Sequence, residues 1–304
     1  MKVGDLFHVV HIVDDLPTAE NWYDRVFAPT YMFRRHESSL DHRTASMTLI
    51  ADYPAEPMMA HQGPAGQQGT IGRFHARFGQ RLHSLAWYCD SVGEGYERFR
   101  SFGVRVTGDG GAQLSHPPTR GGIYTHPRDS FGMIELMEPR VAGRGGAPVG
   151  DSLGECYDPR LLGTHDPSWW QTHHPLGIRR TSHITVLVDD LDRAVDLYCE
   201  VLDATTFHQS PGAVFVAVGT GSVVEFRRPE PGAEAEALAR DGAMIWSTTF
   251  LVTDLGAAAS HLGELGVETC GEDGVLAIAT DEAFGARYSF TATVTPGDPR
   301  EAGA

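Results

Sequence analysis

The stretch HITVLVDDLDRAVDLYCEVL, residues 183–202, decides the fold because its pattern recurs three more times along the chain. It opens as a short apolar strand, reaches Asp-Leu, and continues with apolar residues at helical spacing. The related stretches are HVVHIVDDLPTAENWYDRVF (8–27), HSLAWYCDSVGEGYERFRSFG (83–103) and STTFLVTDLGAAASHLGELG (247–266). Fourfold recurrence of one strand–helix unit predicts an internally repeated architecture.

Each unit also has an aspartate at the same position. An aspartate stands seven residues after its first residue, where the N-cap of the helix belongs, at Asp15, Asp90, Asp190 and Asp254. Strand-like stretches follow the helices, for example TYMFRRHE (30–37) and RTASMTLIAD (43–52). The first unit resembles the third and the second resembles the fourth. The pattern therefore predicts an α+β chain of four βαβββ modules, produced by duplication of a two-module unit.

Domain limits follow from this repeat. Two modules are expected in residues 1–140 and two in residues 181–295. Residues 141–180 are rich in Gly and Pro but also contain Trp169 and Trp170, which predicts an ordered connector rather than a flexible linker. We expect the two tryptophans to pack the connector against the domains. Residues 296–304 are expected to form a frayed tail.

The composition excludes several protein classes. Among 304 residues, 41% are apolar and no stretch approaches the roughly 20 apolar residues that span a membrane. The first residues do not form a secretory signal, and the four cysteines are widely spaced, which indicates a cytoplasmic protein with reduced thiols. The net charge of −16 argues against a nucleic-acid partner. We expect a monomer or homodimer that binds a small molecule.

Chemistry-bearing residues recur in register with the repeats. The first position of the four units is His8, His83, His183 and Ser247, and strand alternation can aim one residue per strand into a shared cavity. The module ends supply Glu56, Glu135, Glu225 and Ser289 at equivalent places. Glu135 and Glu225 lie within apolar runs, where an unpartnered carboxylate is costly. The first half thus offers two imidazoles and two carboxylates, whereas the second half offers only two credible ligands.

The sequence resembles the vicinal-oxygen-chelate superfamily, which includes glyoxalase I, methylmalonyl-CoA epimerase, extradiol dioxygenases and bleomycin-resistance proteins. The resemblance rests on the starts of the form HxxxxVxDL, the strand end IELMEP (134–139) and the paired repeats. It implies two paired-module domains with cupped mixed sheets. Carried over position by position, it places a divalent metal on His8, Glu56, His83 and Glu135. His183 and Glu225 are interpreted as remnants of a degenerate second site.

The implied function is a metal-dependent isomerase or lyase of the glyoxalase and epimerase kind. Such a set of nitrogen and oxygen ligands suits Fe, Ni, Co, Mn or Zn and leaves adjacent positions for a vicinally oxygenated substrate. The metal would stabilise an enediolate, with Glu56 or Glu135 as the catalytic base. Tyr124, His126 and Arg120 are candidate substrate-binding residues. No binding motif for another cofactor is identified.

Two other functions remain open at this point. Without Glu56 the site is His8, His83 and Glu135, the facial triad of an Fe(II) extradiol-type dioxygenase. The four-module length favours that class, but its triad usually lies in the C-terminal half, where this chain has Ser247 and Ser289. A protein that binds a ligand without catalysis, as in drug resistance, is the third hypothesis, and metal content separates it from the other two.

Overall fold

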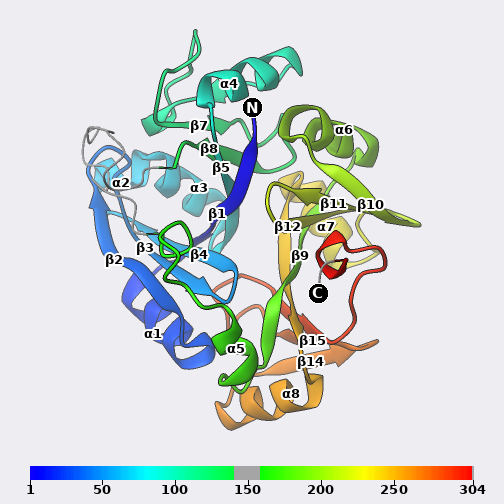
Figure 1. Cartoon of the computed structure of the whole chain (residues 1–304). Coiled ribbons are helices and arrows are strands. Elements are labelled where there is room, and N and C mark those ends of the chain that lie inside the picture. The colour runs from blue at the N-terminus through cyan, green and yellow to red at the C-terminus, as the bar shows by residue number, and fades with distance from the viewer. Residues whose placement is uncertain (140–157, 303–304) are drawn as a thin grey trace.

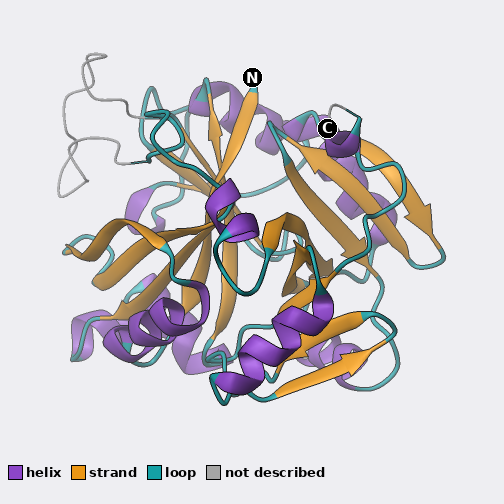
Figure 2. Cartoon of the chain, turned by 60° about the horizontal axis from the view of Figure 1, so that its bottom comes forward, coloured by secondary structure: helices purple, strands orange, loops and turns teal. Residues whose placement is uncertain are grey.

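The computed structural model describes residues 1–139 and 158–302. Within these ranges the chain forms two eight-stranded mixed sheets that lie side by side with helices around them (Figure 1). Residues 3–137 build the first sheet, and residues 178–291 build the second. Figure 2 shows the strands of the two sheets as separate groups flanked by helices.

The first sheet has the strand order β2-β3-β4-β1-β5-β8-β7-β6. Its strands are β1 (Val3–Ile12), β2 (Thr30–Ser38), β3 (Arg43–Ile50), β4 (Tyr53–Ala60), β5 (Arg81–Cys89), β6 (Val106–Thr107), β7 (Gly122–Thr125) and β8 (Met133–Met137). Its helices are α1 (Leu16–Phe27), α2 (Pro64–Gln68), α3 (Thr70–Phe78) and α4 (Val92–Ser101), with the 3-10 turn η1 (Asp109–Gly111). The helices α2 and α3 connect the two modules of this half.

The second sheet repeats this order as β10-β11-β12-β9-β13-β16-β15-β14. Its strands are β9 (Ile178–Leu187), β10 (Thr205–Ser210), β11 (Ala213–Val218), β12 (Ser222–Arg227), β13 (Met244–Val252), β14 (Thr269–Glu272), β15 (Val275–Ile278) and β16 (Tyr288–Thr291). The remaining helices are α5 (Ser168–Thr172), α6 (Leu191–Leu202), α7 (Ala233–Asp241) and α8 (Leu255–Glu264), followed by the turn η2 (Pro299–Glu301).

Strand pairing within each half confirms the predicted four βαβββ modules. The first strand of a module pairs in parallel with its last strand, as in β1 with β4 and β5 with β8. The two first strands then pair with each other in antiparallel fashion and join the modules, as β1 and β5 do. The second half repeats this scheme through β9 and β13. The first strands of both modules therefore lie at the centre of each sheet.

Three of the four predicted helix caps are present. The side chains of Asp15, Asp190 and Asp254 each accept a hydrogen bond from a backbone N–H of the first helical turn. The prediction for Asp90 was wrong, because Ser91 caps α4 through the N–H of Glu94. Asp90 accepts instead from the backbone N–H of Lys2. An aspartate and a serine in sequence offer two caps, and the side chain one residue later has the cap geometry.

One apolar core runs through both halves. Aromatic side chains of α1 pack on the second sheet, with the rings of Phe27 and Phe250 centred 5.6 Å apart. The hydroxyls of Tyr23 and Tyr288 are 2.5 Å apart across the same junction. The indole N–H of Trp87 donates to Ser222 Oγ at 2.8 Å. Burial of these large rings, each contributing about 1.5 to 3 kcal/mol, holds the halves together.

The predictions for the connector and for the tail have different outcomes. The predicted connector, 141–180, lies outside the described residues up to residue 157. Trp170 is buried as expected and donates to the carbonyl of Phe27 at 2.8 Å, whereas Trp169 stays 39% exposed. The prediction of a frayed tail was wrong for residues 296–301. There Arg300 donates to the carbonyls of Thr181, Ser182 and Gly221, so the segment is held against the second sheet.

Two further findings bear on the composition argument. Cys89, Cys199 and Cys270 are free, and Cys156 lies outside the described residues. Among residues 1–139 and 158–302, no helix has the length and apolar character needed to cross a membrane.

Candidate functional site

Four neighbouring strands at the centre of the first sheet bring the predicted ligands together. His8 lies on β1, Glu56 on β4, His83 on β5 and Glu135 on β8, and all four line one cavity of about 80 Å³. Strand alternation points these side chains to the same face, because each occupies the inward register of its strand. Residues far apart in the sequence thus meet in one cup.

His8 lies between the two carboxylates. Its Nε2 is 3.0 Å from Glu135 Oε2, and its Nδ1 is 3.1 Å from Glu56 Oε2. The contact with Glu135 is a hydrogen bond, whereas the contact with Glu56 lacks hydrogen-bond alignment and leaves both atoms unpaired. All three side chains are buried. Burial opposes protonation of His8, but the two glutamates outweigh it and raise its pKa above the ordinary value.

His83 is the second imidazole of the cup. Its Nδ1 is buried without a hydrogen-bond partner among the described residues, and its ring stands perpendicular to that of Phe74 at 4.3 Å. Burial, followed by the charges of His8 and Arg43, lowers the pKa of His83 to about 4. The ring is therefore neutral near pH 7. A neutral imidazole with a free lone pair is the form that binds metal ions.

The donor set fits a divalent metal in kind, although the side chains do not yet converge on one point. Two imidazoles and two carboxylates suit borderline and hard cations, and three buried atoms, His8 Nδ1, His83 Nδ1 and Glu56 Oε2, have unused hydrogen-bonding capacity. Within the described ranges, no three His, Cys, Asp or Glu side chains are grouped as a metal site. The reason is visible at His8, since the two carboxylates contact opposite nitrogens of its ring.

Two charged residues that the sequence reasoning missed also line the cavity. Arg43 Nη1 is 3.3 Å from Glu56 Oε1, and Arg43 Nε is 3.5 Å from Asp41 Oδ2. Arg43 pairs with Ala60 across β3 and β4, four residues from Glu56 and hence on the same face. Strand alternation could have found Arg43 if the pairing register of β3 had been known.

The three predicted substrate-binding residues have different surroundings. Tyr124 lines the cavity and donates its hydroxyl hydrogen bond to Asp109 at 3.2 Å. Burial, together with Glu135, raises the pKa of Tyr124 well above its ordinary value, so the phenol stays protonated. His126 lies outside the cavity lining, 3.2 Å from Arg105 Nη2, and Arg120 is exposed.

The equivalent positions of the second half form a poorer set. His183 Nε2 is 3.7 Å from Glu225 Oε2, and Thr185 donates to the same carboxylate oxygen at 2.6 Å. Ser247 and Ser289 stand where the first half has His83 and Glu135. The ring of Phe215 packs edge-on against His183 at 5.2 Å. Glu225 is thus satisfied by a hydroxyl, and the second cup holds half the donors of the first.

His11 belongs to the junction of the halves rather than to the cup. Its Nδ1 is 2.9 Å from the hydroxyl of Tyr23, and its Nε2 is 3.0 Å from the carbonyl of Phe284. It therefore lies on the face opposite to His8, in keeping with the odd offset of three residues between them along the strand. Burial lowers the pKa of His11 to about 4, so it remains neutral at physiological pH.

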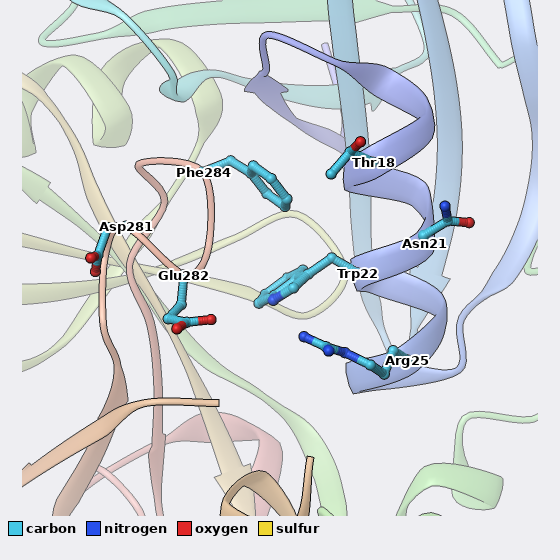
Figure 3. A pocket seen from close by; sticks show the side chains of 7 residues that line it. All are labelled: Thr18, Asn21, Trp22, Arg25, Asp281, Glu282 and Phe284. Atoms are coloured by element: carbon cyan, nitrogen blue, oxygen red, sulfur yellow. The ribbon is translucent and has the colours of Figure 1, made fainter. Parts of the chain in front are cut away.

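A larger hollow of about 470 Å³ lies on the surface at this junction (Figure 3). Trp22 and Arg25 of α1 face Glu282 and Phe284 of the second half across it. None of the predicted site residues lines it. The cup of the first half, although smaller, is the place where the residues with metal-binding and acid–base chemistry meet.

Known proteins resemble the chain in sequence and in fold. A sequence profile of the Glyoxalase/Bleomycin resistance protein/Dioxygenase superfamily matches residues 180–300. A mutant 4-hydroxymandelate synthase from Streptomyces coelicolor is similar in structure, with TM-score 0.64, 15% identity, and coverage of 95% of this chain and 92% of that one. At this identity the likeness establishes the fold and no more.

Two other solved structures are also similar to the chain. A fusion of a xylose isomerase-like TIM barrel with a 4-hydroxyphenylpyruvate dioxygenase has TM-score 0.56 and 13% identity, over 99% of this chain and 51% of that one. Methylmalonyl-CoA epimerase from Mycobacterium tuberculosis has 22% identity over 45% of this chain and 89% of its own, with TM-score 0.38. A search of curated proteins found no matching sequence.

Proposed function

Because residues 180–300 match the profile of the Glyoxalase/Bleomycin resistance protein/Dioxygenase superfamily and the first half repeats their strand order, we propose that the first half is a metal-dependent isomerase or lyase. Its substrate would be a small molecule with two neighbouring oxygens, from which a proton is removed next to a carbonyl. The observation that supports this most directly is the meeting of two imidazoles and two carboxylates around one cavity, with His8, Glu56 and Glu135 buried and His83 partly buried. Side chains of this kind are rarely buried together without a role in binding or catalysis.

We assign His8, His83, Glu56 and Glu135 as the ligands of a divalent ion. The ion would supply stabilisation of the negative charge that develops on the substrate oxygens. For it to bind, the ring of His8 must turn so that one nitrogen faces the cavity together with His83. That turn separates His8 from at least one of the carboxylates that it now contacts.

Glu135 is the residue that we assign to accept the proton. Glu56 has two charged contacts, with Arg43 Nη1 at 3.3 Å and with His8 Nδ1 at 3.1 Å. Glu135 forms an ion pair with His8 alone among the described residues, so it becomes available for proton transfer when His8 turns away. A base in this position could return the proton to a neighbouring carbon, which would complete an isomerisation.

The Arg43 contact also favours a second candidate function. If Arg43 retains Glu56, the remaining ligands are His8, His83 and Glu135, a facial triad that suits non-haem Fe(II) and dioxygen chemistry. The chain would then be an oxygenase. Oxygen consumption with catechols, measured on iron-loaded protein, would distinguish this reaction from proton transfer.

Elemental analysis by mass spectrometry of the purified protein tests both proposals. We expect about one divalent metal per chain, lost in Glu135→Ala and weakened in Glu56→Ala. Glu225→Ala, at the equivalent position of the second half, is the matched control and should retain the metal. An unchanged metal content in Glu56→Ala would favour the triad and the oxygenase.

One result would reject both enzymes. If the wild-type protein contains no metal even after reconstitution with Fe, Co, Ni, Mn or Zn, the cup would bind its ligand without metal chemistry. The chain would then be a binding protein, the third function that the sequence leaves open.

A further inference from the structure

We propose that Arg43 binds a carboxylate of the substrate, so that the enzyme acts on a small acid with an anionic group in addition to its vicinal oxygens. This proposal rests on the function proposed above and narrows its substrate class. It assigns a specificity-determining role to a residue that lies beside the proposed ligands without being one of them.

Arg43 is the single lysine or arginine among the described residues that line the cavity. It stands at the first position of β3, and its side chain is 20% exposed, which leaves part of the guanidinium accessible from the cup. An arginine that lines a cavity of about 80 Å³ lies within reach of a small molecule bound there. Its charge would select against neutral analogues of the same shape.

The present partners of Arg43 hold it loosely. Its two acidic contacts, at 3.3 and 3.5 Å, go to two different carboxylates and are longer than the 2.7–2.9 Å typical of charge-assisted hydrogen bonds. Two other arginines of the chain each bind one carboxylate with two nitrogens at shorter distances. Arg105 donates to Asp129 from Nε at 2.7 Å and from Nη2 at 2.8 Å. Arg160 donates to Asp158 from Nε at 3.0 Å and from Nη2 at 2.7 Å.

The two long contacts leave the guanidinium fork of Arg43 available to a ligand. No described residue accepts a hydrogen bond from its Nη2, and a planar carboxylate would satisfy Nη1 and Nη2 together. The charged residues around the cavity are consistent with this role of Arg43. Asp41, Glu56 and Glu135 line the cavity together with Arg43 and His8, and a divalent cation would lower the repulsion that these carboxylates exert on an incoming acid.

Metal binding and acid binding are therefore expected to act in sequence. When Glu56 turns toward a bound cation, Arg43 loses that contact and retains only the longer one to Asp41. The guanidinium is then free to pair with the acid. Asp41 competes with the substrate for Arg43, which gives the proposal a consequence opposite in sign to loss of the arginine.

Three acids test the proposal by isothermal titration calorimetry on the metal-loaded protein. Glycolate carries vicinal oxygens alone, succinate carries two carboxylates without a vicinal hydroxyl, and malate carries both features. Wild type should bind malate at least about tenfold more tightly than glycolate or succinate, because a charged hydrogen-bonded pair adds that much. Arg43→Gln should lower the affinity for malate to that for glycolate and leave glycolate binding unchanged.

Asp41→Asn is the opposing variant. The asparagine Oδ1 can still accept the hydrogen bond that Asp41 receives from the N–H of Gly110, whereas the hydroxyl of Ser38, which now donates to Oδ2 at 3.3 Å, would have to accept from the amide instead. We expect this variant to bind malate more tightly than wild type, because it removes the competitor of the substrate. A merely structural Arg43–Asp41 pair predicts instead that both variants weaken malate binding, and that result would overturn the proposal.

Metal analysis of every variant separates this proposal from the proposed function. A wild type that holds no metal and binds no glycolate counts against the enzyme, and a wild type that binds malate no better than glycolate counts against Arg43. An unchanged malate preference in Arg43→Gln also overturns it. If Arg43→Gln fails to load metal, Arg43→Lys decides, since it keeps the charge without the fork and should show a reduced preference.

Discussion

The two halves of the molecule share one strand order but differ in what fills their cups. In the first half, two imidazoles and two carboxylates surround a cavity, and His8 leaves a nitrogen unpaired. In the second, Glu225 is satisfied by Thr185, serines replace two of the donors, and Arg300 of the tail donates to backbone carbonyls within β9. A fold with paired modules thus holds its strands in place whether or not the cup contains ligands.

This difference shows that the sheet and the site depend on different sets of interactions. The sheet depends on backbone pairing and on the outward apolar face of each strand, which both halves retain. The cup depends on a few inward side chains, whose replacement by serine costs little packing. Comparison of the halves therefore isolates the chemistry of the cup from the stability of the fold.

The largest expected effect concerns whether the halves are one cooperative unit. Phe27→Ala should destabilise the protein by about 3 to 5 kcal/mol, because Phe27 is fully buried against Phe250 at the junction. Phe226→Ala removes a ring buried inside the second half and should cost a similar amount. Differential scanning calorimetry should give one transition in both variants. If two transitions appear and Phe226→Ala lowers the temperature of only the one that belongs to the second half, the halves unfold separately.

A smaller effect concerns acid stability at the same junction. The unfolded chain binds a proton at His11 near pH 6.5, whereas the folded chain does so only near pH 4. Stability is therefore complete above pH 6.5 and is lost as the pH falls toward 4, by about 3 kcal/mol at this site. His11→Gln should unfold with a shallower pH dependence in urea titrations over this range.

His116→Gln, at an exposed histidine, is the matched control for that measurement. It should retain the wild-type slope of unfolding free energy against pH. A slope in His11→Gln equal to that of wild type would mean that other buried histidines, and not the junction, set the acid sensitivity.

The smallest effect should be confined to the second half. Arg300→Ala removes a side chain that donates to three backbone carbonyls, at a cost of about 2 kcal/mol. Arg179→Ala, which loses only a half-exposed contact with Glu301, should cost less than about 1 kcal/mol. Thermal unfolding measures both. Metal content should not change in either variant, and a loss in Arg300→Ala would show that the tail influences the first cup.

Much of the candidate site could be anticipated from residue positions alone. His8, His83 and Glu135 were found because they recur at one register of the repeat, and alternation then points them to one face. Glu56 was harder, since Pro54 and Pro57 beside it argue against a central strand. The structure places Pro54, Glu56 and Pro57 in β4, between β3 and β1. The strand tolerates the missing N–H groups of the two prolines there.

The sequence by itself determined the modules, because helix caps, helical spacing and strand alternation are local properties that recur in each repeat. Only the tertiary structure decided which side chains meet across elements. Arg43 reaches Glu56 because β3 and β4 pair in a particular register, and His11 meets Phe284 because the two halves dock. Arg300 reaches β9 from the other end of its domain. Contacts of this kind depend on the shape of folded surfaces, and no local pattern of residues encodes that shape.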